Sequence, residues 1–230
     1  MRTANPNSIR DDFVAALADV RTTFISAENS NIAAGGKKLI TEFSFLSAAI
    51  LLEGYISDLF VAYINRDDTA FAAHLVGHMK IETNDPFATE AKGFASISIR
   101  KHLTTAEIRS VLDSKDYNVT FPTVDAMKAG AGKWLSNADK VHFHNISAAH
   151  GAVIEATKAI RNFLAHRSPA SKATMQNALT NAHLPADLRR GQHQIKDAGS
   201  FLLAKPTPPQ SHRLALYLTQ LEQIATSLCP

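Results

Sequence analysis

The 230-residue sequence has few of the residues that mark specialised classes of protein. Cys229 is its only cysteine, so an internal disulfide is impossible and a disulfide-stabilised secreted scaffold is excluded. Ten glycines and nine prolines are modest for this length, and no segment is of low complexity or repeats at a fixed period. We therefore expect one ordered domain over residues 1–230, in the reducing environment of the cytoplasm.

A large excess of charge and a long uncharged apolar run are also missing. The 24 Lys and Arg residues exceed the 21 Asp and Glu residues by only three, so the net charge is compatible with an anionic partner but does not predict one. Met1–Arg10 has no apolar stretch of the signal-peptide kind. Phe43–Ile64 is apolar but carries Glu53 and Asp58, each of which costs about 2.5–3.5 kcal/mol near a bilayer centre. We expect a buried core helix there and no membrane partner.

Apolar residues recur at three- and four-residue spacing along most of the chain, which predicts an all-α fold. The arrangement expected is an antiparallel helical bundle with a long irregular insert, about residues 168–210, before the last helix. The expected helices run from about Ser8 to a loop at Glu28–Gly36, then over Lys37–Asn65, Asp67–Lys80, Thr105–Leu112, Val124–Ser136, Ser147–His166, Ser171–Ala182 and Ser211–Leu228.

The remaining segments are expected to be connections. Thr83–Gly93 is rich in turn residues, and residues 94–99 are compatible with either an extended or a helical conformation. Tyr117–Phe121 is expected to form a brief strand, and Asn137–Asn145 a polar connection rich in histidine. Pro169 should close the helix that reaches His166, and Lys205–Pro209 should be an extended link.

The end of the Ser147–His166 helix combines a fixed cation with a titratable imidazole, in the segment Arg161-Asn162-Phe163-Leu164-Ala165-His166. The planar guanidinium of Arg161 matches two phosphate oxygens. A histidine exchanges protons near neutral pH. These are the two side chains that phosphodiester cleavage needs. The structural alternative is that Arg161 is a solvated helix charge and that His166 interacts favourably with the helix C-terminus.

The spacing of the two residues sets a geometric condition. Residues five apart on an ideal helix lie roughly 140° apart around the axis, whereas Asn162 and His166, four apart, share a face. Arg161 must therefore reach round the helix, or the helix must loosen before Pro169.

Arg161, Asn162 and His166 match the arginine, following polar residue and histidine of the motif that marks HEPN domains (higher eukaryotes and prokaryotes nucleotide-binding). The early helix, Phe45-Leu-Ser-Ala-Ala-Ile-Leu-Leu-Glu53-Gly-Tyr55-Ile-Ser-Asp58-Leu-Phe60, resembles the first core helix of the RiboL-PSP-HEPN and MAE-28990-like branches. The resemblance covers about Lys37–Leu228. It implies a helical bundle, a homodimer that brings two motifs together, and RNA cleavage in toxin, phage-defence or RNA-processing settings.

Carried over by position, the resemblance implies that Arg161 stabilises the phosphorane and His166 handles the proton. Asn162 would orient the phosphate or His166. Glu53 is a fourth candidate for the catalytic site, because a carboxylate in a nearly apolar helix needs a partner, and Arg161 is a plausible one; the alternative is a snorkelling or interface role. Four basic residues are candidates for RNA binding, against the alternative of a solvated face: Arg167, Arg189, Arg190 and Lys196.

No metal or other cofactor is expected. His74 and His78 have the four-residue spacing of a two-histidine metal face, but no third ligand is suggested and Leu75 stands where a zincin helix has glutamate. Without a metal to activate water, the nucleophile must come from the substrate, and in RNA that is the 2′-hydroxyl. We expect a metal-independent endoribonuclease that acts on RNA.

Two hypotheses remain open at this stage. The first is the dimeric endoribonuclease, with an antitoxin or defence-complex protein as a possible partner. In HEPN toxins that a nucleotidyltransferase antitoxin modifies, a tyrosine follows the histidine by two residues; Ser168 stands there, so that control is not expected. The second hypothesis is a catalytically silent HEPN module that binds RNA, a nucleotide or a partner protein.

Overall fold

The computed structural model describes residues 4–80, 85–91, 97–99, 102–113, 118–206 and 211–230. These residues form helices and connections with no strand among them, which confirms the prediction of an all-α fold. The helices are α1 (Pro6–Glu28), α2 (Ala34–Arg66), α3 (Thr69–His78), α4 (Pro86–Ala91), α5 (Thr105–Leu112), α6 (Val124–Trp134), α7 (Asn137–His144), α8 (Ala148–His166), α9 (Pro169–Ala178), the 3₁₀ turn η2 (Ala186–Leu188), α10 (Ala198–Leu203) and α11 (Arg213–Leu228).

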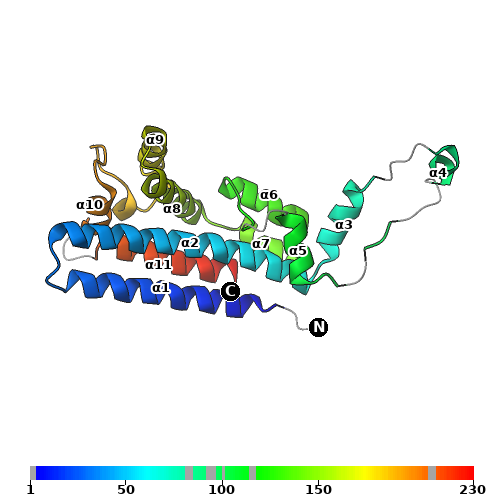
Figure 1. Cartoon of the computed structure of the whole chain (residues 1–230), viewed down its shortest axis with the longest axis horizontal. Coiled ribbons are helices and arrows are strands. Elements are labelled where there is room, and N and C mark those ends of the chain that lie inside the picture. Colours follow the sequence, from blue (N-terminus) through cyan, green and yellow to red (C-terminus); the bar gives the residue numbers. More distant parts are fainter. Residues whose placement is uncertain (1–3, 81–84, 92–96, 100–101, 114–117, 207–210) are drawn as a thin grey trace.

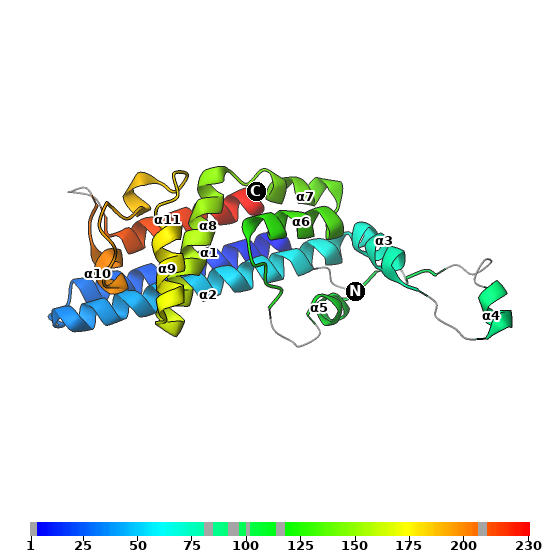
Figure 2. The same cartoon turned by 90° about the horizontal axis from the view of Figure 1, so that it is seen from above.

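Helix α2 is the centre of the molecule. Helices α1, α2 and α11 run alongside one another, α8 and α9 cross them, and α4 lies away from the bundle (Figures 1 and 2). The ring of Phe13 stacks on Tyr55 with centroids 4.5 Å apart, and Phe45 meets Tyr217 edge-on at 5.3 Å. These aromatic contacts join α2 to α1 on one side and to α11 on another, so one core spans the bundle.

Helix α2 is also long and apolar enough to cross a bilayer by length and composition. In the fold, 61% of its most apolar 18-residue window is buried inside the protein. This is the packing expected of the core helix that the sequence predicted.

Two tyrosines of α2 donate hydrogen bonds to carbonyl groups in the last turn of α11, one of which, that of Ala225, also accepts from the N–H of Cys229. The last four carbonyl groups of a helix have no partner within the helix itself. The buried hydroxyl of Tyr55 donates to the carbonyl oxygen of Ala225 at 3.0 Å, and that of Tyr63 donates to Leu228 at 2.8 Å. The two helices are therefore joined by directional bonds as well as by apolar packing.

Helix α8 begins where the sequence predicted. The Ser147 hydroxyl caps it by accepting a hydrogen bond from the backbone N–H of His150 at 3.1 Å. It also ends at His166 as predicted, but the residue that ends it differs from the expectation: Arg167, at φ 51°, adopts the left-handed conformation, and Pro169 is the first residue of α9. Proline suits a first helical position because no N–H is required there. Pro169 thus begins the next helix.

Several expected boundaries and connections were wrong. Helix α1 begins at Pro6, because the Asn5 side chain accepts from the N–H of Asn7 and replaces Ser8 as the cap. Helix α2 begins at Ala34, before Gly36, and the predicted helix over Ser171–Ala182 is α9, Pro169–Ala178. The insert at 168–210 is only partly irregular, since it contains α9, η2 and α10.

The predicted polar connection Asn137–Asn145 is helix α7. Ser136 caps it by accepting from the N–H of Asp139, and Phe143 anchors it in the core. The predicted strand at Tyr117–Phe121 is not present over Asn118–Phe121, and Tyr117 lies outside the described residues. Parts of the segments at 83–93, 94–99 and 205–209 likewise lie outside them.

Candidate functional site

Arg161 pairs with Glu53 where α8 crosses α2. The guanidinium Nη2 lies 3.3 Å from Glu53 Oε2, and the two side chains are 30% and 25% exposed. The pairing that the sequence suggested is therefore present. The Nε of Arg161 is buried and has no hydrogen-bond partner among the described residues. The guanidinium is thus held by its tip, at the edge of the core.

Asn162 holds the same guanidinium from the other side. Its Oδ1 accepts a hydrogen bond from Arg161 Nη1 at 3.0 Å. The structure shows no hydrogen bond between the described side chains of Asn162 and His166, although they share a helix face. Asn162 therefore positions the guanidinium of Arg161.

His166 is the last residue of α8 and its side chain is exposed. Within the described part of the chain, its imidazole makes no hydrogen bond or ring contact. Helix α8 stays regular through His166, so Arg161 points to α2 while His166 lies roughly 140° further round the axis. One chain alone does not bring the two side chains of the motif together.

Arg167 links the end of α8 to two other helices. Its Nη2 donates to Glu42 Oε2 at 2.5 Å, and its guanidinium lies 5.6 Å from the centre of the Phe163 ring. The other oxygen of Glu42 accepts from the N–H of Gly199, the second residue of α10. Arg167, expected to bind RNA, is half-exposed but already paired with a carboxylate.

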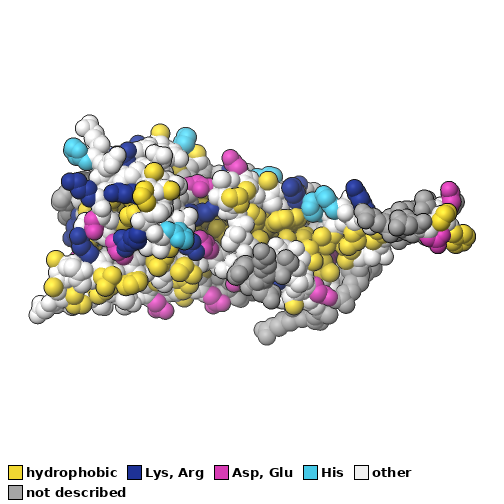
Figure 3. Space-filling view, turned by 45° about the horizontal axis from the view of Figure 1, so that its top comes forward, with side chains coloured by type: hydrophobic (Ala, Val, Ile, Leu, Met, Phe, Trp, Pro, Cys, Tyr) yellow, Lys and Arg dark blue, Asp and Glu magenta, His cyan; other side chains and the backbone are white. Residues whose placement is uncertain are grey.

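The other candidate RNA contacts lie in the connection between α9 and α10. Arg189 Nε donates to the carbonyl of Leu184 at 2.7 Å, and Arg190 Nε donates to that of Gln176 at 3.1 Å. Both arginines therefore fix the path of this connection, while Lys196 is exposed. Lys and Arg side chains gather over the half of the molecule that contains α8, α9 and α10 (Figure 3).

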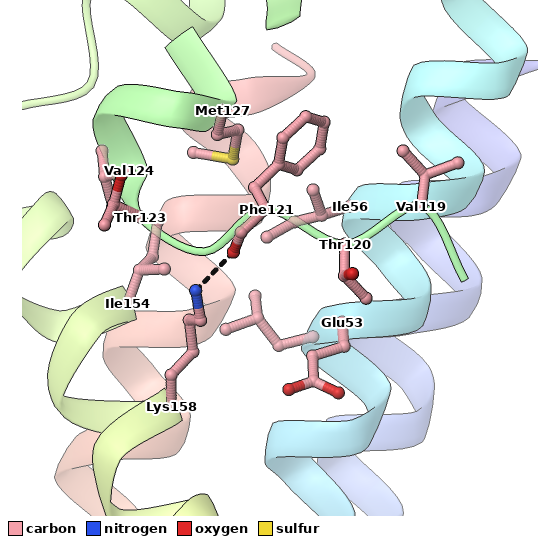
Figure 4. Close-up of a pocket in the computed structure, with 11 residues that line it drawn as sticks. Glu53, Ile56, Val119, Thr120, Phe121, Thr123, Val124, Met127, Ile154 and Lys158 are labelled. Atoms are coloured by element: carbon pink, nitrogen blue, oxygen red, sulfur yellow. Dashed lines mark hydrogen bonds between the residues drawn. The ribbon is translucent and has the colours of Figure 1, made fainter. Parts of the chain in front are cut away.

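A small cavity lies beside Glu53, between α2, α6 and α8. Its volume is about 50 Å³. Glu53 stands at its rim, and the Lys158 ammonium donates to the carbonyls of Phe121 and Pro122 at 2.5 and 2.6 Å (Figure 4). Its remaining walls are mostly apolar: Leu52, Ile56, Val119, Thr120, Thr123, Val124, Met127 and Ile154. The segment before α6 is thus fastened next to the arginine–glutamate pair.

Sequence reasoning missed Glu42 and Lys158, which hold the surroundings of the site. A signal for Glu42 was present: it precedes Glu53 by eleven residues, just over three full turns, so both carboxylates lie on one side of a mostly apolar helix. Each of them meets an arginine of the motif region, Arg167 and Arg161. The paired acids and the motif therefore form one contact line between α2 and α8.

The described residues include no cluster of three or more His, Cys, Asp and Glu side chains able to hold a metal ion. The His74 and His78 rings lie 4.2 Å apart between centroids, and His78 Nδ1 contacts the carbonyl of His74. Partial burial, together with the neighbouring His78, lowers the pKa of His74.

Comparison of the chain with protein-family models, with curated proteins and with solved structures found no match.

Proposed function

We propose that this protein is a metal-independent endoribonuclease of the HEPN kind, with a HEPN-like bundle and a site built around Arg161 and His166. The observation that carries the proposal is the difference between these two residues of α8. Glu53 and Asn162 position the Arg161 guanidinium, whereas the His166 imidazole is exposed and available for proton transfer. A positioned cation and an available base are what cleavage of a phosphodiester requires.

In the proposed reaction, His166 removes the proton of the substrate 2′-hydroxyl. The 2′-oxygen attacks the adjacent phosphorus, and the bond from phosphorus to the 5′-oxygen breaks. A protonated histidine gives its proton to that leaving oxygen, so the products are a 2′,3′-cyclic phosphate and a 5′-hydroxyl. Arg161 neutralises the charge on the phosphorane oxygens, with Glu53 and Asn162 keeping it in place.

The geometry of one chain favours a homodimeric site. Base and acid must act on opposite sides of the phosphorus, and one chain has a single motif histidine. Two copies of α8 supply two imidazoles and two guanidinium groups. The exposed position of His166 leaves it accessible to a second chain.

We infer that RNA approaches over α8, α9 and α10, where the positive side chains gather. Lys196 and Arg167 are the residues there best placed for phosphate, the second after exchanging Glu42 for the ligand. A cytoplasmic toxin or phage-defence role, with an antitoxin or defence-complex protein as partner, completes the proposal.

The test is cleavage of a defined RNA by the purified protein in EDTA, with the end groups identified. His166→Ala and Arg161→Ala should each slow cleavage by about 100-fold or more. His183→Ala is the matched control, because His183 is also exposed and belongs to no motif. Equal rates for His166→Ala and the parent would overturn the site assignment.

One observation favours the alternative, a catalytically silent HEPN module that binds RNA, a nucleotide or a partner protein. Arg161 and Arg167 are both paired with carboxylates, so neither guanidinium is free. In this case the two ion pairs stabilise the packing of the helices. Glu53→Gln should then increase RNA binding, because it releases Arg161, without producing any cleavage. Measuring binding and product formation on the same samples separates the two functions.

A further inference from the structure

A groove between α1 and α2 is separate from the motif on α8. The two helices lie side by side over most of their length (Figures 1 and 2). The groove has a volume of about 380 Å³. Among the described residues, its lining combines apolar side chains with two carboxylates and comprises Ile9, Asp12, Phe13, Ala16, Ile50, Leu51, Gly54, Tyr55, Asp58 and Asn118.

Small residues leave room at the floor of the groove. Ala16 on α1 and Gly54 on α2 leave little side-chain bulk, and a Cβ built on Gly54 meets no atom within 4 Å. The stacked rings of Phe13 and Tyr55 lie below, and Ile50, 50% exposed, forms part of the wall. An extended pair of packed helices with small residues between them is filled best by the apolar side of a third helix, whose side chains repeat at three- and four-residue spacing.

The charge around the groove determines which kind of helix can bind there. Asp12 is exposed on α1, and Asp19, seven residues later, lies on the same side of that helix. On α2, Asp58 forms an ion pair with Arg109 at 2.5 Å. Among the described residues, Arg109 is the one cation in contact with a carboxylate of the groove. No Lys or Arg belongs to the described lining. The groove is thus apolar with an acidic border.

This border distinguishes between possible occupants. A second copy docked groove to groove would bring its exposed carboxylates Asp12 and Asp19 near those of the first copy, and like charges in an interface are unfavourable. RNA and an anionic lipid surface are repelled for the same reason, and on the face that Figure 3 shows Lys and Arg side chains gather over α8, α9 and α10. A helix with Lys or Arg on both sides of an apolar stripe matches the apolar floor of the groove with its stripe and the acidic border with its cations.

We propose that the α1–α2 groove is a docking site for a basic amphipathic helix of a partner protein. The helix places its apolar residues over Ala16 and Gly54 and its cations beside Asp12 and, two turns further along α1, Asp19. The site goes beyond the proposed ribonuclease function and does not depend on it. It offers a way to attach a regulator or a complex subunit without covering α8.

The experiment uses the full chain and a synthetic 18-residue helical peptide with leucines at three- and four-residue spacing and lysines on both flanks. Its dye-labelled form is titrated with protein, and anisotropy gives the dissociation constant at low and moderate salt. A peptide with glutamate in place of every lysine is the charge control. We expect the lysine peptide to bind at least tenfold more tightly than the glutamate peptide, and more weakly as salt rises.

Two variants locate the peptide. Gly54→Leu fills the groove and should weaken binding at least tenfold, whereas Gly77→Leu on α3, whose added Cβ also meets nothing within 4 Å, should leave it unchanged. Asp12→Lys should weaken the lysine peptide and strengthen the glutamate peptide, and this reversal does not depend on filling the groove. Circular dichroism verifies that each variant is folded.

Three results would overturn the proposal. The first is equal binding of both peptides, and the second is equal binding by Gly54→Leu and Gly77→Leu. The third is self-association or binding to anionic vesicles that Gly54→Leu abolishes while peptide binding stays intact, because the groove would then serve a second copy or a membrane.

Discussion

The contact between Glu53 and Arg161 should contribute about 1 kcal/mol to the free energy of unfolding. At an effective dielectric constant of about 20, charges at this separation attract by roughly 5 kcal/mol before the loss of hydration is counted. Three features reduce this value: both side chains are partly exposed, the separation of 3.3 Å is longer than in a strong charge-assisted hydrogen bond, and Arg161 Nε has no partner among the described residues. Exposed pairs measure about 0.2–1 kcal/mol, so a value near the top of that range is expected for this half-buried pair.

The assay is a double-mutant cycle. Urea unfolding of the parent, Glu53→Gln, Arg161→Gln and the double variant gives four free energies, and the two single losses should exceed the loss in the double variant by about 1 kcal/mol. A second cycle combines Glu53→Gln with Lys172→Gln, on a different helix, and should be additive. A coupling for Glu53 and Arg161 below about 0.3 kcal/mol, the usual scatter of independent sites, would refute the view that Glu53 holds the arginine in place.

Four further predictions follow from the fold and the proposed site. Gly54→Ala should stabilise the protein by about 0.5–1 kcal/mol in urea, because a helix-interior glycine gains a Cβ in open space, whereas Gly130→Ala should destabilise it, because the new Cβ would lie 2.8 Å from the Phe121 ring. Burial lowers the pKa of His150, so the unfolded state binds more protons than the folded state as the pH falls through about 6.5, and the protein loses stability. His150→Gln should therefore lose less stability than the parent between about pH 7 and pH 5. An equal loss in the variant and the parent would contradict this. Cleavage should stop when the nucleotide 5′ of the scissile phosphate is made 2′-deoxy, and continued cutting at that bond would rule out attack by the 2′-hydroxyl. Specific activity should fall on dilution together with the dimer seen by light scattering, and a fully active monomer would remove the composite site.

Local sequence patterns predicted the strongest helices well. Helix α8 has a serine cap, an apolar side and a clear end near His166, and all three signals act within the segment itself. Helix α7 failed because only Phe143 of its core-facing side is large and apolar, while three histidine and aspartate side chains suggested a loop. Its helical state depends on the Ser136 cap and on packing against α6, which composition does not reveal.

The candidate site shows the same division. The ion pair of Glu53 with Arg161 was accessible from sequence, because a carboxylate in an apolar helix needs a partner. The engagement of Arg189 and Arg190 with backbone carbonyls was not, since a basic pair in a connection has the same appearance whether it faces solvent or fastens a loop. Whether a cation is free is determined by tertiary contacts far apart in the sequence.

The two tyrosine bonds between α2 and α11 limit how this bundle can move. Tyr55 and Tyr63 reach carbonyls three residues apart in the last turn of α11, so the two helices have a fixed register. Sliding α11 by half a turn, about 2.7 Å, would take both carbonyls away from the tyrosines and leave two buried hydroxyl groups without acceptors, at about 1–3 kcal/mol each. Shear between these helices is therefore disfavoured. Any conformational signal that crosses the bundle must travel as a hinge or rotation of the elements outside this pair, such as α8 and α9.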